Sequence, residues 1–81
     1  MEKSENFHIG NAIHEQLLKN GQSVVWLAKQ LKVKRATLYR IFANPHIDTF
    51  TLQQISVVLR HNFAAEFAEL LDIRIDKLPK V

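Results

Sequence analysis

The chain has 81 residues, a length that fits a single small domain and disfavours a large cofactor pocket or a cleft between domains. It has no cysteine, which excludes disulfides and thiolate metal sites. No apolar run approaches the roughly 18 residues that span a bilayer, and the polar residues at the start lack a signal-peptide segment. We therefore expect a cytoplasmic protein that does not enter a membrane.

The net charge of +3 is small, but the positive residues are concentrated in the middle of the chain. Residues 16–47 contain six Lys or Arg and no Asp or Glu, whereas acids outnumber bases on both sides. Such a segment favours binding to a polyanion, with an affinity that falls as salt rises. A solvated face without a partner explains the charge equally well.

The first two predicted helices follow a polar N-terminus, residues 1–7, which we expect to be flexible. In the first helix apolar residues recur at i, i+4 and i+8. Asn20 and Gly21 form a helix-stop signal, because glycine readily takes a positive φ. Ser23 is a good N-cap for a second helix at about residues 24–31.

A third helix is predicted at about residues 35–43 and ends before Pro45, which disfavours helical backbone at the preceding residue. Asp48 is the expected cap of a fourth helix, and a fifth begins at Phe63. Residues 73–81 alternate apolar and polar side chains and form either a short extended segment or a loose tail. The predicted fold is all-α, a compact bundle of five short helices. The side chains expected in its core are Ile9, Ile13, Leu17, Val24, Leu27, Ala28, Leu31, Leu38, Ile41, Phe42, Leu52, Ile55, Val58 and Leu59.

The sequence offers no group of residues that favours catalysis. Only two glycines are present, so a glycine-rich phosphate loop is excluded, and no nucleophile elbow occurs. The histidines show neither the HxxxH nor the HExxH spacing that would hold a metal. We expect structural or surface roles for them, no cofactor and no enzymatic activity. These histidines are His8, His14, His46 and His61.

The stretch LAKQLKVKRATLYRIF, residues 27–42, contains two short predicted helices with a break of about three residues. The small Ala28 permits the helices to cross closely. Leu31 and Val33 are expected to pack beneath the turn, and Leu38 to anchor the second helix. This pattern predicts a helix-turn-helix, whose second helix can lie in the DNA major groove. The outward-facing residues of that helix would be Lys34, Arg35, Ala36, Tyr39, Arg40 and Ala43.

Residues 9–60 resemble the phage-repressor (Cro-like, xenobiotic-response-element type) family of helix-turn-helix DNA-binding regulators. The resemblance rests on IGNAIHEQLLKNG, SVVWLAKQLKVKRATLYRIF and IDTFTLQQISVVL, and includes the family's Leu-Ala pair at Leu27 and Ala28. The Trp-Leu-Ala, YRIF and ID motifs resemble a variant associated with Bacteroidetes-type bacteria. The resemblance implies a lambda-repressor-like DNA-binding domain, here residues 8–72, followed by a C-terminal tail at 73–81.

Two residues depart from the family's pattern. Lys32 occupies the turn position where the family usually has glycine, because that residue is left-handed and a Cβ costs roughly 1 kcal/mol there. Lys34 replaces the usual Ser or Thr cap and cannot accept a hydrogen bond. Either both changes lower the folding stability and in return strengthen the attraction to phosphate, or they are neutral substitutions that the fold tolerates.

The candidate DNA contacts follow from this resemblance and from helical geometry. Arginine's planar group matches the guanine edge, so Arg35 and Arg40 are the first candidates for base contacts, with phosphate as the alternative. Tyr39 either reaches the DNA through its hydroxyl or packs half-buried against the turn. The expected base contacts are Arg35, Ala36, Tyr39 and Arg40, and the expected phosphate contacts are Ser23, Lys29, Lys32, Lys34 and Thr37.

Apolar residues outside the helix-turn-helix suggest either extra core or a second interface. Trp26 is expected to be peripheral core, and Val25 could be plain surface. The fifth helix either closes the core of a monomer or forms a two-fold dimer. The residues of that possible dimer interface are Phe63, Phe67, Leu70 and Leu71.

The sequence therefore predicts a sequence-specific regulator that binds double-stranded DNA, acts as a repressor and is associated with the nucleoid. A homodimer and a protein partner are both possible. One alternative is an antitoxin-like protein-interaction module that uses the C-terminal helix, with DNA binding secondary. Another is a small nucleoid protein that binds DNA without sequence preference.

Overall fold

The computed structural model describes residues 7–78. These residues form five α-helices: α1 (Ile9–Lys19), α2 (Val24–Leu31), α3 (Arg35–Ala43), α4 (Thr49–Leu59) and α5 (Phe63–Asp76). The predicted all-α bundle of five short helices is confirmed for this part of the chain. The flexibility predicted for residues 1–6, and the end of the tail at 79–81, lie outside the described residues.

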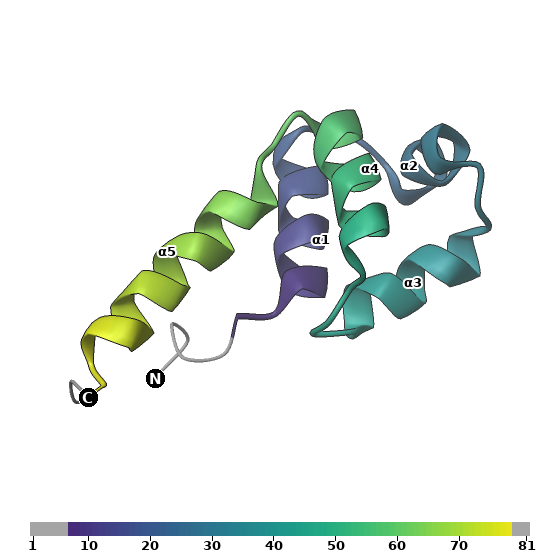
Figure 1. Ribbon diagram of the computed structural model, residues 1–81. Helices are drawn as coiled ribbons and strands as arrows, with labels where there is room; N and C mark the ends of the chain where they lie inside the picture. Colours follow the sequence, from purple (N-terminus) through teal and green to yellow (C-terminus); the bar gives the residue numbers. More distant parts are fainter. Residues whose placement is uncertain (1–6, 79–81) are drawn as a thin grey trace.

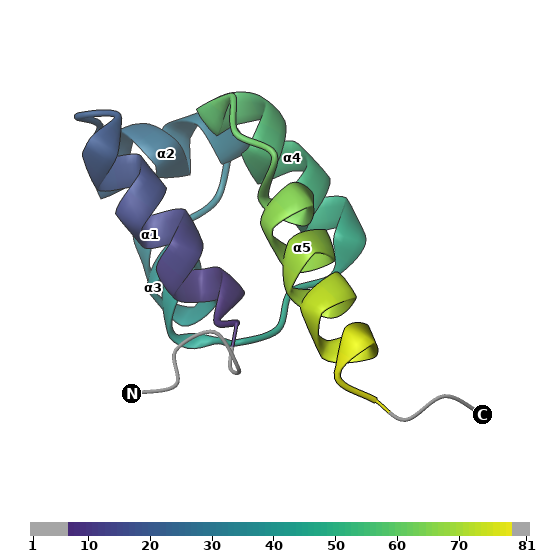
Figure 2. The same ribbon diagram turned by 90° about the vertical axis from the view of Figure 1, so that its left-hand side faces the viewer.

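The helices α1 and α4 form the centre of the molecule, with α2 and α3 on one side and α5 on the other (Figure 1). In the view of Figure 2, α5 lies in front and runs away from the body. The described part is therefore elongated, with extents of 47 × 25 × 20 Å. None of the described helices is long and apolar enough to cross a membrane.

A single apolar core joins all five helices. Most of its buried side chains were predicted from the helical spacing, and no polar side chain is buried among the described residues. Burial of each large side chain contributes roughly 1.5–3 kcal/mol relative to exposure. Of the other side chains predicted for the core, Leu31, Ile41 and Leu52 lie half-buried at its edge. The buried core residues are Ile9, Ile13, Leu17, Leu27, Ala28, Leu38, Phe42, Ile55, Leu59 and Phe63.

Gly10 allows α1 to lie directly against the end of α3. Its N–H donates to the carbonyl of Asn44 at 3.2 Å. A Cβ at Gly10 would collide with the backbone carbonyl oxygens of Ile41 and Phe42. Only a residue without a side chain therefore permits this contact, which fixes the position of α3.

The ends of the helices follow local chemistry. Ser23 accepts a hydrogen bond from the Trp26 N–H at 3.0 Å, and Asp48 accepts one from the Thr51 N–H at 2.7 Å. Both caps were predicted, as was the positive φ of Gly21, which is 72°. Each cap satisfies a backbone N–H that the first helical turn leaves unpaired.

The helix α5 differs from the prediction at its C-terminal end. Residues 73–76 are helical, so the expectation of an extended segment is wrong there. Phe67, Leu71 and Ile75 recur every four residues, and this helical spacing overrides the local alternation. Phe7 was expected to be flexible, but it is half-buried and its ring lies 5.8 Å from that of Phe67.

Candidate nucleic-acid interface

The turn between α2 and α3 is built around Lys32. This residue is left-handed, with φ 59° and ψ 44°, which is the conformation that the resemblance implies for the usual glycine. The Lys32 N–H donates to the carbonyl of Lys29 at 3.3 Å, and the Val33 N–H donates to that of Ala28 at 3.0 Å. These bonds close the end of α2 and aim the chain into α3. Val33 itself is 37% exposed, so its predicted position beneath the turn is wrong.

The start of α3 carries positive charge in place of a side-chain cap. Lys34 has extended backbone and makes no capping hydrogen bond, as its lack of an acceptor predicts. Its carbonyl accepts from the Thr37 N–H at 3.0 Å and begins the helix. The first amides of α3 thus keep the partial positive charge of a helix N-terminus, and the lysine ammonium adds to it.

One face of α3 points inward and the other points to solvent. Leu38 is fully buried and Phe42 is 6% exposed, so these two side chains anchor the helix. His14 of α1 stacks on the Phe42 ring with centroids 4.4 Å apart. The predicted orientation of α3 is confirmed, because its outward residues are exposed. These are Lys34, Arg35, Ala36, Tyr39, Arg40 and Ala43.

Tyr39 lies at the centre of this exposed face. Its side chain is 56% exposed, and the edge of its ring meets Phe42 with centroids 6.1 Å apart. The ring therefore meets a side chain on the next turn of its own helix. Its hydroxyl remains available to a ligand as both donor and acceptor.

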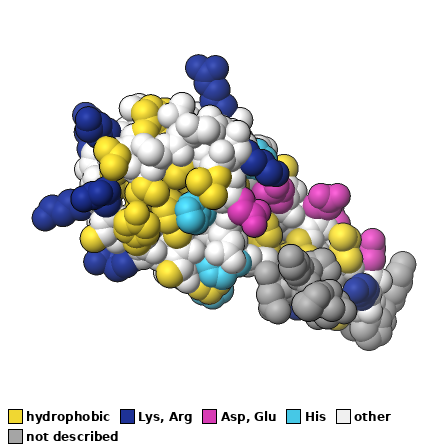
Figure 3. All heavy atoms as spheres, turned by 180° about the vertical axis from the view of Figure 1, so that it is seen from behind, with side chains coloured by type: hydrophobic (Ala, Val, Ile, Leu, Met, Phe, Trp, Pro, Cys, Tyr) yellow, Lys and Arg dark blue, Asp and Glu magenta, His cyan; other side chains and the backbone are white. Residues whose placement is uncertain are grey.

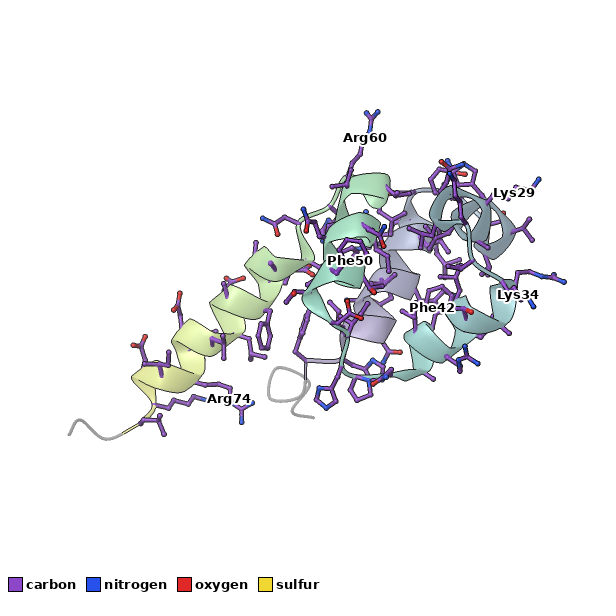
Figure 4. The ribbon with its side chains drawn as sticks, turned by 45° about the vertical axis from the view of Figure 1, so that its right-hand side comes forward. Lys29, Lys34, Phe42, Phe50, Arg60 and Arg74 are labelled. Carbon is purple, nitrogen blue, oxygen red and sulfur yellow. The ribbon has the colours of Figure 1, made fainter. Side chains whose placement is uncertain are left out.

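The predicted phosphate contacts extend from α2 across the turn. Lys29, Lys32 and Lys34 are exposed, and Figure 4 shows Lys29 and Lys34 projecting from the same end of the molecule. Ser23 is exposed at the start of α2, and its hydroxyl can donate to a phosphate while its oxygen caps the helix. Thr37 is half-buried and lies beside a groove at the far edge of α3.

That groove adds residues that the sequence did not single out. It has a volume of about 520 Å³ and lies between α3, the following loop and α4. Asn44 and His46 of the loop and Thr51 of α4 line it together with Arg40. Polar residues in a loop have no periodic signal, so only the fold reveals that they lie next to the exposed face of α3.

Asp48 also lines this groove, together with Arg40. Hydrogen bonds from the Thr51 backbone N–H and hydroxyl hold the pKa of its carboxyl below the ordinary value. The carboxylate is thus committed to capping α4.

Charge is separated along the molecule. Viewed from behind, Lys and Arg side chains gather at the end away from α5, and acidic ones lie toward α5 (Figure 3). No acid occurs between residues 16 and 47, which include α2 and α3. The face around α3 is thus an electropositive surface of the kind that attracts a polyanion.

The histidines take part in local structure. His8 accepts a hydrogen bond from the Asn11 N–H at 3.0 Å and caps α1. His61 lies 3.4 Å from the carboxylate of Glu66. Among the described residues no group of three or more histidines and acids could hold a metal ion.

Comparison with known families supports the assignment of this region. Residues 15–44 match the family described as the helix-turn-helix domain of resolvase. These residues form a helix-turn-helix. The match covers α2, the turn, α3 and about half of α1, which is less than half of the chain. No curated protein and no solved structure matches the chain at a significant level.

The helix-turn-helix supports DNA as a partner of the α2–α3 region. The matched family is of the resolvase type, so the resemblance to Cro-like repressors rests on the sequence motifs alone.

The residues suggested for a dimer interface divide into two groups. Phe63 is fully buried within the chain and cannot offer a contact surface, so its assignment to an interface is wrong. Leu70 is half-buried, whereas Phe67 and Leu71 are exposed.

Trp26 is half-buried against the core, as predicted, and Val25 is exposed.

Proposed function

We propose that the protein is a sequence-specific transcriptional regulator that places α3 in the major groove of double-stranded DNA. The observation that carries this proposal is the exposed face of α3, which combines two arginines and a tyrosine within a matched helix-turn-helix. An α-helix with its side chains is about 10–12 Å across, which fits a major groove about 12 Å wide. The Cro-like resemblance favours a repressor that acts by occupying an operator.

The base contacts are assigned to Arg35, Ala36, Tyr39 and Arg40. Arg35 is the first residue of α3, where a recognition helix contacts base edges, and its planar group matches guanine O6 and N7. Arg40 lies more than one turn further along and beside the groove. The phosphate contacts are assigned to Ser23, Lys29, Lys32, Lys34 and Thr37, and we place the protein in the cytoplasm at the nucleoid.

The lysines predict how affinity depends on salt. Each phosphate that a protein neutralises contributes about 0.9 to the slope of log affinity against log salt. Three lysines at phosphates therefore give a slope of about −3 or steeper. This electrostatic part positions the protein without reading sequence, and the residues of α3 supply the selectivity.

A protein-interaction module is the second candidate, and α5 is the observation that favours it. This helix leaves Phe67, Leu71 and Ile75 exposed, which the helix-turn-helix does not require. In an antitoxin-like protein such a helix would hold a partner protein, and DNA binding would be secondary.

Selection of purified protein on random duplex DNA, at near-physiological salt, distinguishes these functions. An enriched motif supports the regulator. Salt-sensitive binding without enrichment would instead indicate a nucleoid protein that ignores sequence. Absence of binding would contradict the DNA-binding proposal and leave the protein-interaction module as the remaining candidate.

A further inference from the structure

An exposed apolar surface lies between the end of α2 and α4. Phe50 is 67% exposed and Val57 is 71% exposed, and both lie on α4 (Figure 4 labels Phe50). Together with Lys32 they line a groove of about 490 Å³. We call this groove the α4 surface. Its residues are Gln30, Leu31, Lys32, Phe50, Gln53, Gln54, Val57 and Val58.

A second exposed apolar surface runs along α5. Phe67, Leu71, Ile75 and Leu78 follow one another at intervals of four, four and three residues, which places them on one side of a helix. The Leu78 N–H donates to the Ile75 carbonyl at 3.1 Å, so the helical turn includes the last of them. All four side chains are at least 41% exposed, and we call this row the α5 stripe.

One copy of the chain cannot bring these two surfaces together. The helix α5 is anchored at its start by the buried Phe63 and lies against α1. From there it runs away from α4, as Figure 1 shows. The distal part of the stripe therefore has no access to the α4 surface of its own chain.

Charge favours contact between the stripe of one copy and the α4 surface of another. The helix α5 carries Glu66, Glu69, Asp72 and Asp76 against Arg74 as its single base, and Lys77 follows it. Two such helices packed together would bring like net charges into contact, which is unfavourable. The α4 surface instead has Lys32 at its edge and contains no acid.

The spacing of the two surfaces also matches. Phe50 and Val57 are seven residues apart, and so are Leu71 and Leu78. Seven residues make two helical turns, or about 10 Å, so side chains of two such helices can interdigitate over the same length. We propose that the protein self-associates by docking the α5 stripe of one copy on the α4 surface of a second copy. This inference does not rest on DNA binding.

Sedimentation velocity of the full chain, without DNA, tests the proposal. The wild type is expected to associate at micromolar concentrations. Leu71→Glu on the stripe and Val57→Glu on the α4 surface should each raise the dissociation constant by at least about tenfold. Leu18→Glu is the matched control, because Leu18 is 62% exposed on α1 and belongs to neither surface. Circular dichroism checks that each variant is folded, and Phe50→Glu replaces Val57→Glu if that variant is not.

Mixing the two defective variants gives the decisive result. Leu71→Glu keeps an intact α4 surface and Val57→Glu keeps an intact stripe, so the mixture should regain association that neither variant shows alone. Rising salt should weaken the wild-type complex, because the contact joins opposite charges.

Two outcomes would overturn the proposal. If Val57→Glu associated like the wild type while Leu71→Glu did not, two α5 helices would be packing on each other. If the wild type stayed monomeric at every concentration tested, a second copy would not be the occupant of either surface.

Discussion

The helices α3 and α5 each present one face to solvent, and the two exposed faces carry different side chains. The face of α3 is polar and basic around Arg35, Tyr39 and Arg40. That of α5 is apolar, with acids beside it. Two buried side chains anchor the nine residues of α3, whereas Phe63 is the only fully buried anchor among the fourteen of α5. Both helices are amphipathic, with apolar residues at helical spacing. The side chains on the solvent-exposed face of each helix determine which class of partner that helix can bind.

The largest expected effect comes from the single anchor of α5. Phe63→Ala should lower the free energy of unfolding by about 3–5 kcal/mol, because it removes a fully buried ring. Ile75→Ala, on the exposed part of the same helix, should change it by about 0.5 kcal/mol or less. Urea denaturation measures both. Equal losses for the two variants would contradict the view that Phe63 is the main anchor of α5.

The position of α3 depends on the glycine of α1 that it touches. Gly10→Ala should lower the free energy of unfolding by about 1–3 kcal/mol, because the added methyl meets backbone carbonyls that cannot move away. DNA affinity should fall as well, since α3 must shift. Gly21→Ala is the control: it strains a positive φ in open space and should leave DNA affinity unchanged for the folded protein. Normal DNA binding by folded Gly10→Ala would show that this contact does not place α3.

Base reading by α3 is tested by one arginine. Arg35→Ala should cost about 1–3 kcal/mol of discrimination at one base position and relax the selected motif there. Lys29→Ala should instead lower affinity across all sequences and reduce the salt slope by about 1. Binding titrations on variant duplexes measure both effects. An unchanged motif for Arg35→Ala would remove this residue from the base-reading set.

The smallest effects concern the two lysines that depart from the family's pattern. Lys34→Ser supplies a capping oxygen and should raise the free energy of unfolding by about 1 kcal/mol. Lys32→Gly should do the same by relieving a left-handed residue. If each lysine binds phosphate, each variant should also make the slope of log affinity against log salt less steep by about 1. A more stable variant with an unchanged slope would indicate drift.

Local chemistry explains which parts of this structure could be predicted. The Ser23 and Asp48 caps depend on neighbours in sequence, so residue types were enough to find them. The left-handed conformation of Lys32 was implied only by the family resemblance, because a lysine gives no local signal for a positive φ. The inward and outward sides of α3 followed from its periodicity, and with them most candidate DNA contacts.

Contacts between distant segments could not be predicted in this way. Gly10 meets the end of α3 only after folding, and a single glycine in a helix gives no signal of such a contact. The end of α5 was misjudged because residues 73–76 fit an alternating pattern over four positions and a helical pattern only over a longer window. Whether Phe63 belonged to the core or to an interface depended on how α5 meets α1, which no local pattern specifies.

The contrast between the two helices is tested most directly by NMR titration of the labelled protein with a duplex taken from the selection experiment. The largest amide shift changes should occur from Lys34 to Ala43 and at the start of α2, with little change from Glu69 to Asp76. Changes concentrated in α5, with α3 unaffected, would contradict the assignment of α3 as the helix that reads DNA.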